Sequence, residues 1–123
     1  MRLLFLGDVV GRAGRTAIET HLPRLKAAWR IDFAVVNGEN ATAGVGLSPD
    51  HATRILEAGA DVITLGDHAF DQREMLSHIA REPRIVRPLN YAPAAPGLGA
   101  RVFDAPQGRK VLVAQVLGRV FMR

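Results

Sequence analysis

Five polar residues of this sequence follow closely on short apolar runs: Asp8, Glu39, Asn40, Asp67 and His68. The carboxylates and the amide are hard oxygen ligands of the kind that bind metal ions, and the imidazole of the histidine titrates near neutrality. When such groups share one cleft, they are typical of metal-assisted chemistry on a phosphate ester. That chemistry requires the fold to bring them together.

The apolar runs at residues 3–6, 33–36 and 62–65 each lead into a glycine-bearing turn that carries a carboxylate. Such runs are typical of buried strands in a parallel sheet, and open α/β sheets bind ligands beyond the carboxyl ends of their strands. We therefore expect the five polar residues to converge on one edge of one sheet.

Hydrophobic periodicity and turn signals predict alternating strands and helices over the first two thirds of the chain. We expect strands at about 2–6, 32–36, 61–65 and 84–86, and helices at about 14–29, 48–58 and 72–80. The first helix should bury Ile18, Leu22, Leu25 and either Ala28 or Trp29.

Local signals refine the helix boundaries. Pro23 predicts a kink or break in the first helix. Ser48 followed by Pro49 is a good start for the second helix, and Asp71 with Glu74 resembles a capping box for the third. His21, His51 and His78 fall on predicted helices, and we expect them at the surface.

The alternation ends in the irregular, proline-rich segment 87–99. Strands at about 100–104 and 110–117, joined by the turn 105–108, predict an antiparallel hairpin. The fold class is therefore α/β, a βαβαβαβ unit that leads into a β-hairpin. Because no closing helix or polar tail precedes Arg123, we expect residues 1–123 to be the N-terminal part of one longer domain.

Composition narrows the partners and the compartment. The net charge is +4, but the arginines are scattered and not interleaved with aromatic residues, which disfavours a dedicated nucleic-acid groove. The absence of cysteine excludes disulfides and thiolate metal sites and fits a reducing cytoplasm. The sequence also lacks a signal peptide and any apolar stretch of membrane-spanning length, so we expect a cytoplasmic protein without a membrane partner.

Each motif taken alone also has a purely structural interpretation. Asp8 could bind only the amides of its own loop, and Glu39 and Asn40 could belong to a plain turn. His68 beside Asp67 could be a solvated pair. Their co-location at three successive strand ends favours the functional interpretation.

Three motifs, in this order, resemble the YmdB-like branch of the calcineurin-like metallophosphoesterases: Gly7-Asp8, Val36-Asn37-Gly38-Glu39-Asn40 and Thr64-Leu65-Gly66-Asp67-His68. Residues 87–91 (Arg-Pro-Leu-Asn-Tyr) and 118–122 (Gly-Arg-Val-Phe-Met) resemble the same branch. The resemblance runs from Met1 to Arg123 and implies an αββα sandwich with a dinuclear metal centre. Iron and manganese are the usual metal ions of such centres.

The resemblance also implies roles for single residues. Asp8 would hold the first metal ion, Glu39 would bridge both, and Asn40 would lie near metal or phosphate. Asp67 would hold the second metal ion, and His68 would act as general acid. The branch is associated with hydrolysis of 2′,3′-cyclic nucleotides, so the expected partner is a small phosphodiester substrate. We also expect the chain to form a homo-oligomer.

The sequence departs from this branch in two ways. Members commonly carry Asn where this chain has Asp67, and the extra negative charge should tighten metal binding and lower the Lewis acidity of the metal pair. The remaining ligands of the family are histidines of an H-x-H segment, which would lie beyond Arg123. We therefore expect the longer protein, rather than residues 1–123 alone, to bind both metal ions tightly.

The leading hypothesis is metal-dependent hydrolysis of a phosphodiester, with His68 protonating the leaving oxygen. A second hypothesis is a non-catalytic nucleotide- or phosphate-binding regulator that uses the same cleft. A third is a dinucleotide-binding module, which is disfavoured because the loop at 7–14 does not match the G-x-G-x-x-G pattern.

Overall fold

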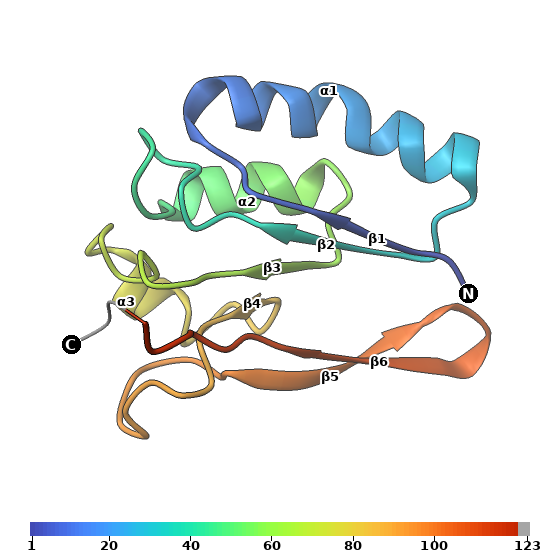
Figure 1. The fold of residues 1–123 in the computed structure, drawn as a ribbon. Coiled ribbons are helices and arrows are strands. Elements are labelled where there is room, and N and C mark those ends of the chain that lie inside the picture. Colours follow the sequence, from blue (N-terminus) through green and yellow to red (C-terminus); the bar gives the residue numbers. More distant parts are fainter. Residues whose placement is uncertain (121–123) are drawn as a thin grey trace.

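The computed structural model describes residues 1–120 and arranges them in layers (Figure 1). Helices α1 and α2 cover one face of a four-stranded sheet, and an antiparallel hairpin lies against the other face. The strands of the sheet are β1 (Leu3–Leu6), β2 (Phe33–Asn37), β3 (Val62–Thr64) and β4 (Ile85–Val86). All pairs are parallel, in the order β1-β2-β3-β4. This confirms the predicted α/β class.

The helix-side core forms because side chains alternate between the two faces of each strand. Ala34 and Val36 of β2 point to the helix side and are fully buried. They pack in one cluster with Ile18 and Leu22 from α1 (Gly11–Trp29). This packing fixes the sheet and hence the positions at which its strands end.

Helix α1 differs from its prediction at three points. It begins at Gly11 because Val10 already pairs with Asn40 in an isolated bridge, so the chain leaves the strand layer there. It continues through Pro23, and the predicted break does not occur. At its C-terminal end Trp29 is 53% exposed, so the predicted apolar stripe stops about one turn early.

No helix within residues 1–120 has the length and apolarity needed to cross a bilayer.

Helix α2 (Pro49–Glu57) confirms its predicted start and its end before Gly59. Ser48 is the N-cap, and its Oγ accepts a hydrogen bond from the His51 backbone N at 3.3 Å. The expected surface position of His51 is wrong, because its ring is half-buried and its Nδ1 lies 2.7 Å from Thr42 Oγ1. His78 is also half-buried rather than exposed.

Helix α3 (Met75–His78) is a single turn, much shorter than the predicted helix at 72–80. Its N-cap Glu74 makes no capping hydrogen bond. The predicted capping box fails because the Asp71 carboxylate is engaged elsewhere, at 2.6 Å from His68 Nδ1. The spacing of Asp71 and Glu74 is typical of a helix cap, but Asp71 contacts the residue three positions before it instead.

The hairpin consists of β5 (Ala100–Ala105), the 3₁₀ turn η1 (Pro106–Gly108) and β6 (Arg109–Ala114), which confirms the predicted antiparallel pair. Strand β6 ends earlier than predicted because the Gln115 carbonyl accepts a hydrogen bond from Leu89 N, outside the hairpin. Of the motif at 118–122, residues 121 and 122 lie outside the described part of the chain.

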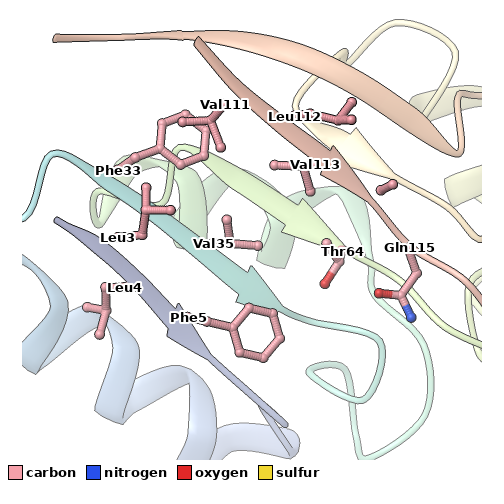
Figure 2. Close-up of a pocket in the computed structure, with 11 residues that line it drawn as sticks. Leu3, Leu4, Phe5, Phe33, Val35, Thr64, Val111, Leu112, Val113 and Gln115 are labelled. Atoms are coloured by element: carbon pink, nitrogen blue, oxygen red, sulfur yellow. The ribbon is translucent and has the colours of Figure 1, made fainter. Parts of the chain in front are cut away.

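The second face of the sheet is only partly covered by the hairpin. Val111 and Val113 of β6 pack on β2, β3 and β4, but Leu3 and Phe5 of β1 remain 57% and 64% exposed. The expectation that β1 is buried is therefore wrong for this face, because β1 is an edge strand beyond the hairpin. An apolar groove runs between β1 and β6 (Figure 2).

Candidate active site

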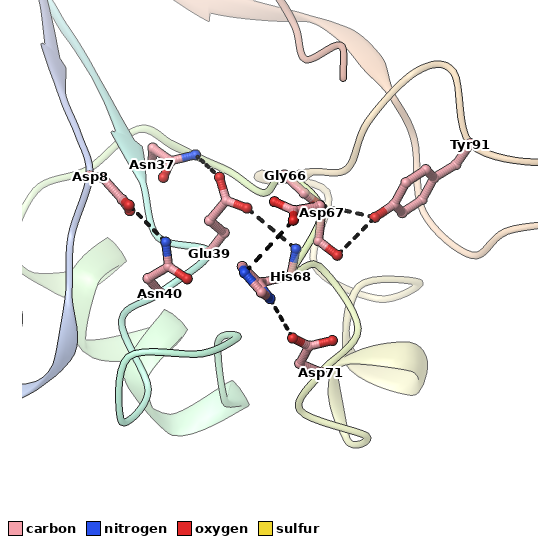
Figure 3. A network of polar contacts seen from close by, with 9 residues as sticks. All are labelled: Asp8, Asn37, Glu39, Asn40, Gly66, Asp67, His68, Asp71 and Tyr91. Carbon is pink, nitrogen blue, oxygen red and sulfur yellow. Dashed lines mark hydrogen bonds and ion pairs between the residues drawn. The ribbon is translucent and has the colours of Figure 1, made fainter. Parts of the chain in front are cut away.

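The parallel register brings three polar strand ends side by side. Leu6 of β1 is level with Val36 of β2, and Asn37 of β2 is level with Thr64 of β3. After each of these three strands the chain turns out of the sheet, and the three turns carry all five residues predicted for the site. The turns lie at the same edge of the sheet (Figure 3).

The first turn is tied to the second. Asn40 Nδ2 donates a hydrogen bond to Asp8 Oδ2 at 2.7 Å, and the backbone N–H of Val9 donates to the Asn37 carbonyl at 3.1 Å. Gly11 N also donates to the Asn40 carbonyl at 2.9 Å. The Asp8 carboxylate is exposed at this position and stays beside the residues that follow β2.

Glu39 is the half-buried carboxylate at the centre of this edge. It accepts hydrogen bonds from Asn37 Nδ2 and from the His68 backbone N, each at 3.3 Å. Burial raises the pKa of Glu39 above its ordinary value, and the nearby Asp67 carboxylate raises it further. The Asn37 and His68 donors oppose that rise.

Gly66 leaves the space that the Glu39 side chain occupies. A Cβ atom at position 66 would overlap both carboxylate oxygens of Glu39. Gly66 is itself buried, so the backbone of the third turn passes close to the carboxylate. The glycine is therefore required for the approach of Glu39 to the Asp67–His68 turn.

His68 is flanked by two carboxylates. Its Nδ1 lies 2.6 Å from Asp71 Oδ2, and its Nε2 lies 3.8 Å from Asp67 Oδ2. The hydrogen bond with Asp71 raises the pKa of His68 above its ordinary value, and Asp67 adds to the effect. The imidazole is therefore biased toward its protonated form and can donate a proton.

Sequence reasoning missed two residues of this network. The sequence predicts Asp71 at a helix cap, whereas its carboxylate contacts His68. The motif at 87–91 indicates no chemical role for Tyr91, yet the Tyr91 hydroxyl donates to the carbonyls of Gly66 and Asp67 (Figure 3). The Tyr91 contact has no local signature, because the fold brings Tyr91 to residues 24 and 25 positions away. Asp71 follows His68 by three residues, and this spacing is the signal that could have indicated their contact.

His68 is the basic side chain that lies beside the carboxylates of the site, 3.8 Å from Asp67. Within residues 1–120, neither lysine nor arginine forms an ion pair with Asp8, Glu39 or Asp67. Over the same residues, the structure contains no group of three His, Cys, Asp or Glu side chains that could hold a metal ion. Within the described part of the chain, these side chains therefore do not form a complete metal-ion site.

Comparisons with known proteins agree with these motifs. A family model described as YmdB-like protein matches residues 4–123. The 2′,3′-cyclic-nucleotide 2′-phosphodiesterase of Bacillus subtilis (strain 168) is 38% identical over 122 residues, which cover 99% of this chain and 46% of that relative.

Two crystal structures share the fold. A hypothetical protein from Thermus thermophilus is 41% identical with a TM-score of 0.92, and the match covers 99% of this chain and 47% of that one. A novel phosphatase from Mycoplasma pneumoniae is 38% identical with a TM-score of 0.85, over 94% of this chain and 42% of that one. The chain thus spans less than half the length of these relatives.

Proposed function

The chain belongs to the YmdB-like protein family, and on that basis we propose that its polar strand ends form part of the active site of a metal-dependent phosphodiesterase. The observation that carries the proposal is the pair of neighbouring carboxylates, Glu39 and Asp67, at adjacent strand ends. Two carboxylates this close raise each other's proton affinity unless a cation lies nearby. Within residues 1–120 neither lysine nor arginine pairs with them, and His68 is the basic side chain beside Asp67, so a metal ion is the cation that fits between the two carboxylates.

The residues present suit hard metal ions such as iron or manganese. Asp8 and Asp67 would each hold one of two ions, and Glu39, between them, would bridge both. Asn40 would lie near metal or phosphate and already holds Asp8 in place through its amide nitrogen. Metal ions bound there would polarise a phosphoryl oxygen and neutralise the charge that develops on it.

His68 is the general acid in this proposal. Its protonated ring would donate a proton to the leaving oxygen of the phosphodiester, and Asp71 would hold the ring through Nδ1. That contact leaves Nε2 as the nitrogen that faces the site, where Asp67 lies 3.8 Å away. The substrate that we propose is a 2′,3′-cyclic nucleotide, the substrate named for the Bacillus relative.

We also propose that residues 1–123 are the N-terminal part of one metallophosphoesterase domain. The matched relatives are more than twice as long, and the metal shell is incomplete within residues 1–120. The exposed apolar side chains of Leu3 and Phe5 mark a face that a further part of the domain would cover.

The direct test is hydrolysis of a 2′,3′-cyclic nucleotide by the complete protein with added Mn²⁺. We expect turnover by the wild type and a loss of about 10²-fold or more in His68→Ala, because general acid catalysis contributes about 10²–10⁴-fold. A nitrophenyl ester, whose leaving group needs no proton, should lose much less. His21→Ala is the matched control, because His21 is exposed on α1, and it should keep wild-type rates.

The outcomes separate the parts of the proposal. Absence of hydrolysis with any added metal would contradict the phosphodiesterase proposal as a whole. Wild-type rates for His68→Ala on the cyclic nucleotide would contradict only the acid role.

A non-catalytic regulator is the alternative, favoured by the incomplete metal shell within residues 1–120. It predicts binding of a cyclic nucleotide or phosphate by calorimetry without turnover under any metal. Turnover that requires Glu39 and Asp67 would exclude it.

A further inference from the structure

The loop after β4 reaches back to the candidate site through one side chain, Tyr91. Its hydroxyl lies 3.1 Å from the Gly66 carbonyl and 3.2 Å from the Asp67 carbonyl, and it donates to both. The two acceptors are successive carbonyls of the turn that carries His68 (Figure 3). One hydroxyl proton is therefore shared between the carbonyls of the two peptide units that precede the proposed acid.

The segment that carries Tyr91 is held firmly on its other side. Leu89 N donates to the Gln115 carbonyl at 2.7 Å, at the end of the hairpin. The Asn90 side chain pairs with the backbone of Leu117 in both directions, at 2.8 and 2.9 Å. These bonds anchor the loop to the second layer of the molecule.

Arg87 supports the same loop from inside. It is buried, and its guanidinium donates to the carbonyls of Pro88, Ala95 and Pro96 at 2.8–3.3 Å. Burying a guanidinium costs free energy unless its N–H groups are paired with acceptors. The loop conformation that keeps these three carbonyls in place is therefore favoured over others. The backbone of the loop that carries Tyr91 is thus held in place by Arg87.

The Tyr91 ring itself has a defined place. It is half-buried and packs against Phe70, with ring centroids 6.0 Å apart at 40°. The hydroxyl at the far end of the ring is the group that donates to the two carbonyls. The ring contact and the hydroxyl contact can therefore be separated by substitution.

The Gly66–Asp67–His68 turn is hydrogen-bonded on two sides. Glu39 accepts the backbone N–H of His68 on one side, and Tyr91 donates to the carbonyls of Gly66 and Asp67 on the other. We propose that Tyr91 is a positioning residue that fixes this turn and so sets the placement of Asp67 and His68. The catalytic part of this inference rests on the proposed phosphodiesterase function.

The first experiment measures amide hydrogen exchange in the complete, metal-free protein and needs no activity. The N–H groups of His68 and Ala69 donate to Glu39 and to the Gly66 carbonyl. In Tyr91→Phe, which keeps the ring and loses the hydroxyl, exchange at these two amides should accelerate about three- to tenfold, the effect of losing one hydrogen bond. Thr53→Val is the matched control. It removes an exposed hydroxyl that donates to the Pro49 carbonyl on α2, and it should leave both amides unchanged.

The second experiment measures steady-state kinetics of the same two variants with Mn²⁺. In Tyr91→Phe, kcat on a 2′,3′-cyclic nucleotide should fall about tenfold with KM within twofold, and kcat on a nitrophenyl ester should fall less. Thr53→Val should stay within twofold of the wild type on both substrates. A contact that served only stability would lower the melting temperature without separating the two substrates.

Accelerated exchange together with the selective loss of kcat supports the proposal. Unchanged exchange at both amides overturns it, whatever the kinetics. Accelerated exchange with unchanged kcat overturns the positioning role and leaves only a structural contact. Failure of the proposed function is recognised separately, because the wild-type protein would then not hydrolyse phosphodiesters at all, while the exchange result would still decide whether Tyr91 fixes the turn.

Discussion

Gly66 and Glu39 pack so closely that the space for a side chain at position 66 is filled by the Glu39 carboxylate. The half-buried Glu39 carboxylate occupies the position where any other residue at 66 would place its Cβ atom. The strand end and the carboxylate can approach one another only because the side chain of residue 66 is absent.

We predict that Gly66→Ala displaces Glu39 and lowers phosphodiesterase kcat of the complete protein by tenfold or more. Overpacking of this kind also costs about 1–3 kcal/mol of stability, which thermal unfolding would record. Gly118→Ala is the matched control, because a Cβ at Gly118 meets nothing within 4 Å. Equal activities of the two variants would contradict the account of Glu39.

Asp71 controls the proton on His68 in this account. A general acid must be protonated, so activity should fall as pH rises through the pKa of His68, and the Asp71 hydrogen bond raises that pKa. Asp71→Asn should therefore move the basic limb of the kcat/KM profile to lower pH. Asp104→Asn, an equal change of charge on the distant hairpin, should leave the limb in place, and an unshifted limb in Asp71→Asn would refute the role of Asp71.

Residue types and order were sufficient to predict that the five residues lie at one edge of the sheet, but not which other residues contact them. The spacing of Asp71 and Glu74 satisfies a capping rule, so sequence alone favours the cap over the contact with His68. The contact of Tyr91 joins residues 24 and 25 positions apart. Only the fold determines such a distance, and no local pattern indicates it.

At the scale of elements, α2 and the loop before it form one capped unit. Thr42 Oγ1 accepts the Ser48 backbone N–H at 2.8 Å and contacts the His51 ring, while Ser48 caps the helix. The loop that follows Glu39 and Asn40 is thereby tied to the start of a helix packed on the sheet.

Ser48→Ala should lower the free energy of unfolding by about 1 kcal/mol, the usual effect of losing an N-cap. Ser77→Ala is the comparison, because Ser77 is exposed and donates only to the Glu74 carbonyl. It should change stability by less than about 0.5 kcal/mol. Denaturant unfolding of both variants measures the difference, and equal midpoints would show that Ser48 is not an effective cap.

Elements with strong local signals were predicted well, and elements that depend on tertiary partners were not. Ser48 and Pro49 marked the start of α2 correctly. Strand β1 is exposed on one face because the hairpin stops short of it. Helix α3 is a single turn despite its local capping signal, because Asp71 contacts His68, three residues before it, instead of the helix. Periodicity reports which faces are apolar, but it does not report what covers them.

At the scale of the whole molecule, the uncovered face beside β1 supports the proposal that this chain is part of a longer domain. Phe5 lies in the apolar groove between β1 and β6 (Figure 2). If the rest of the domain covers this groove, Phe5 is buried in the complete protein.

Phe5→Ala should therefore destabilise the complete protein by about 3–5 kcal/mol, the effect of truncating a buried phenylalanine. Trp29→Ala is the control, because Trp29 is also an exposed aromatic residue but lies on α1, away from the groove. It should cost much less. Similar small effects of both substitutions on thermal unfolding would show that the groove stays open.

The central claim is that Asp8, Glu39 and Asp67 meet at one sheet edge to bind metal ions. The most direct measurement is anomalous diffraction from crystals of the complete protein soaked in Mn²⁺. We predict anomalous peaks about 2.0–2.6 Å from carboxylate oxygens of Asp8, Glu39 and Asp67. Peaks only elsewhere in the molecule, or none at saturating Mn²⁺, would contradict the account.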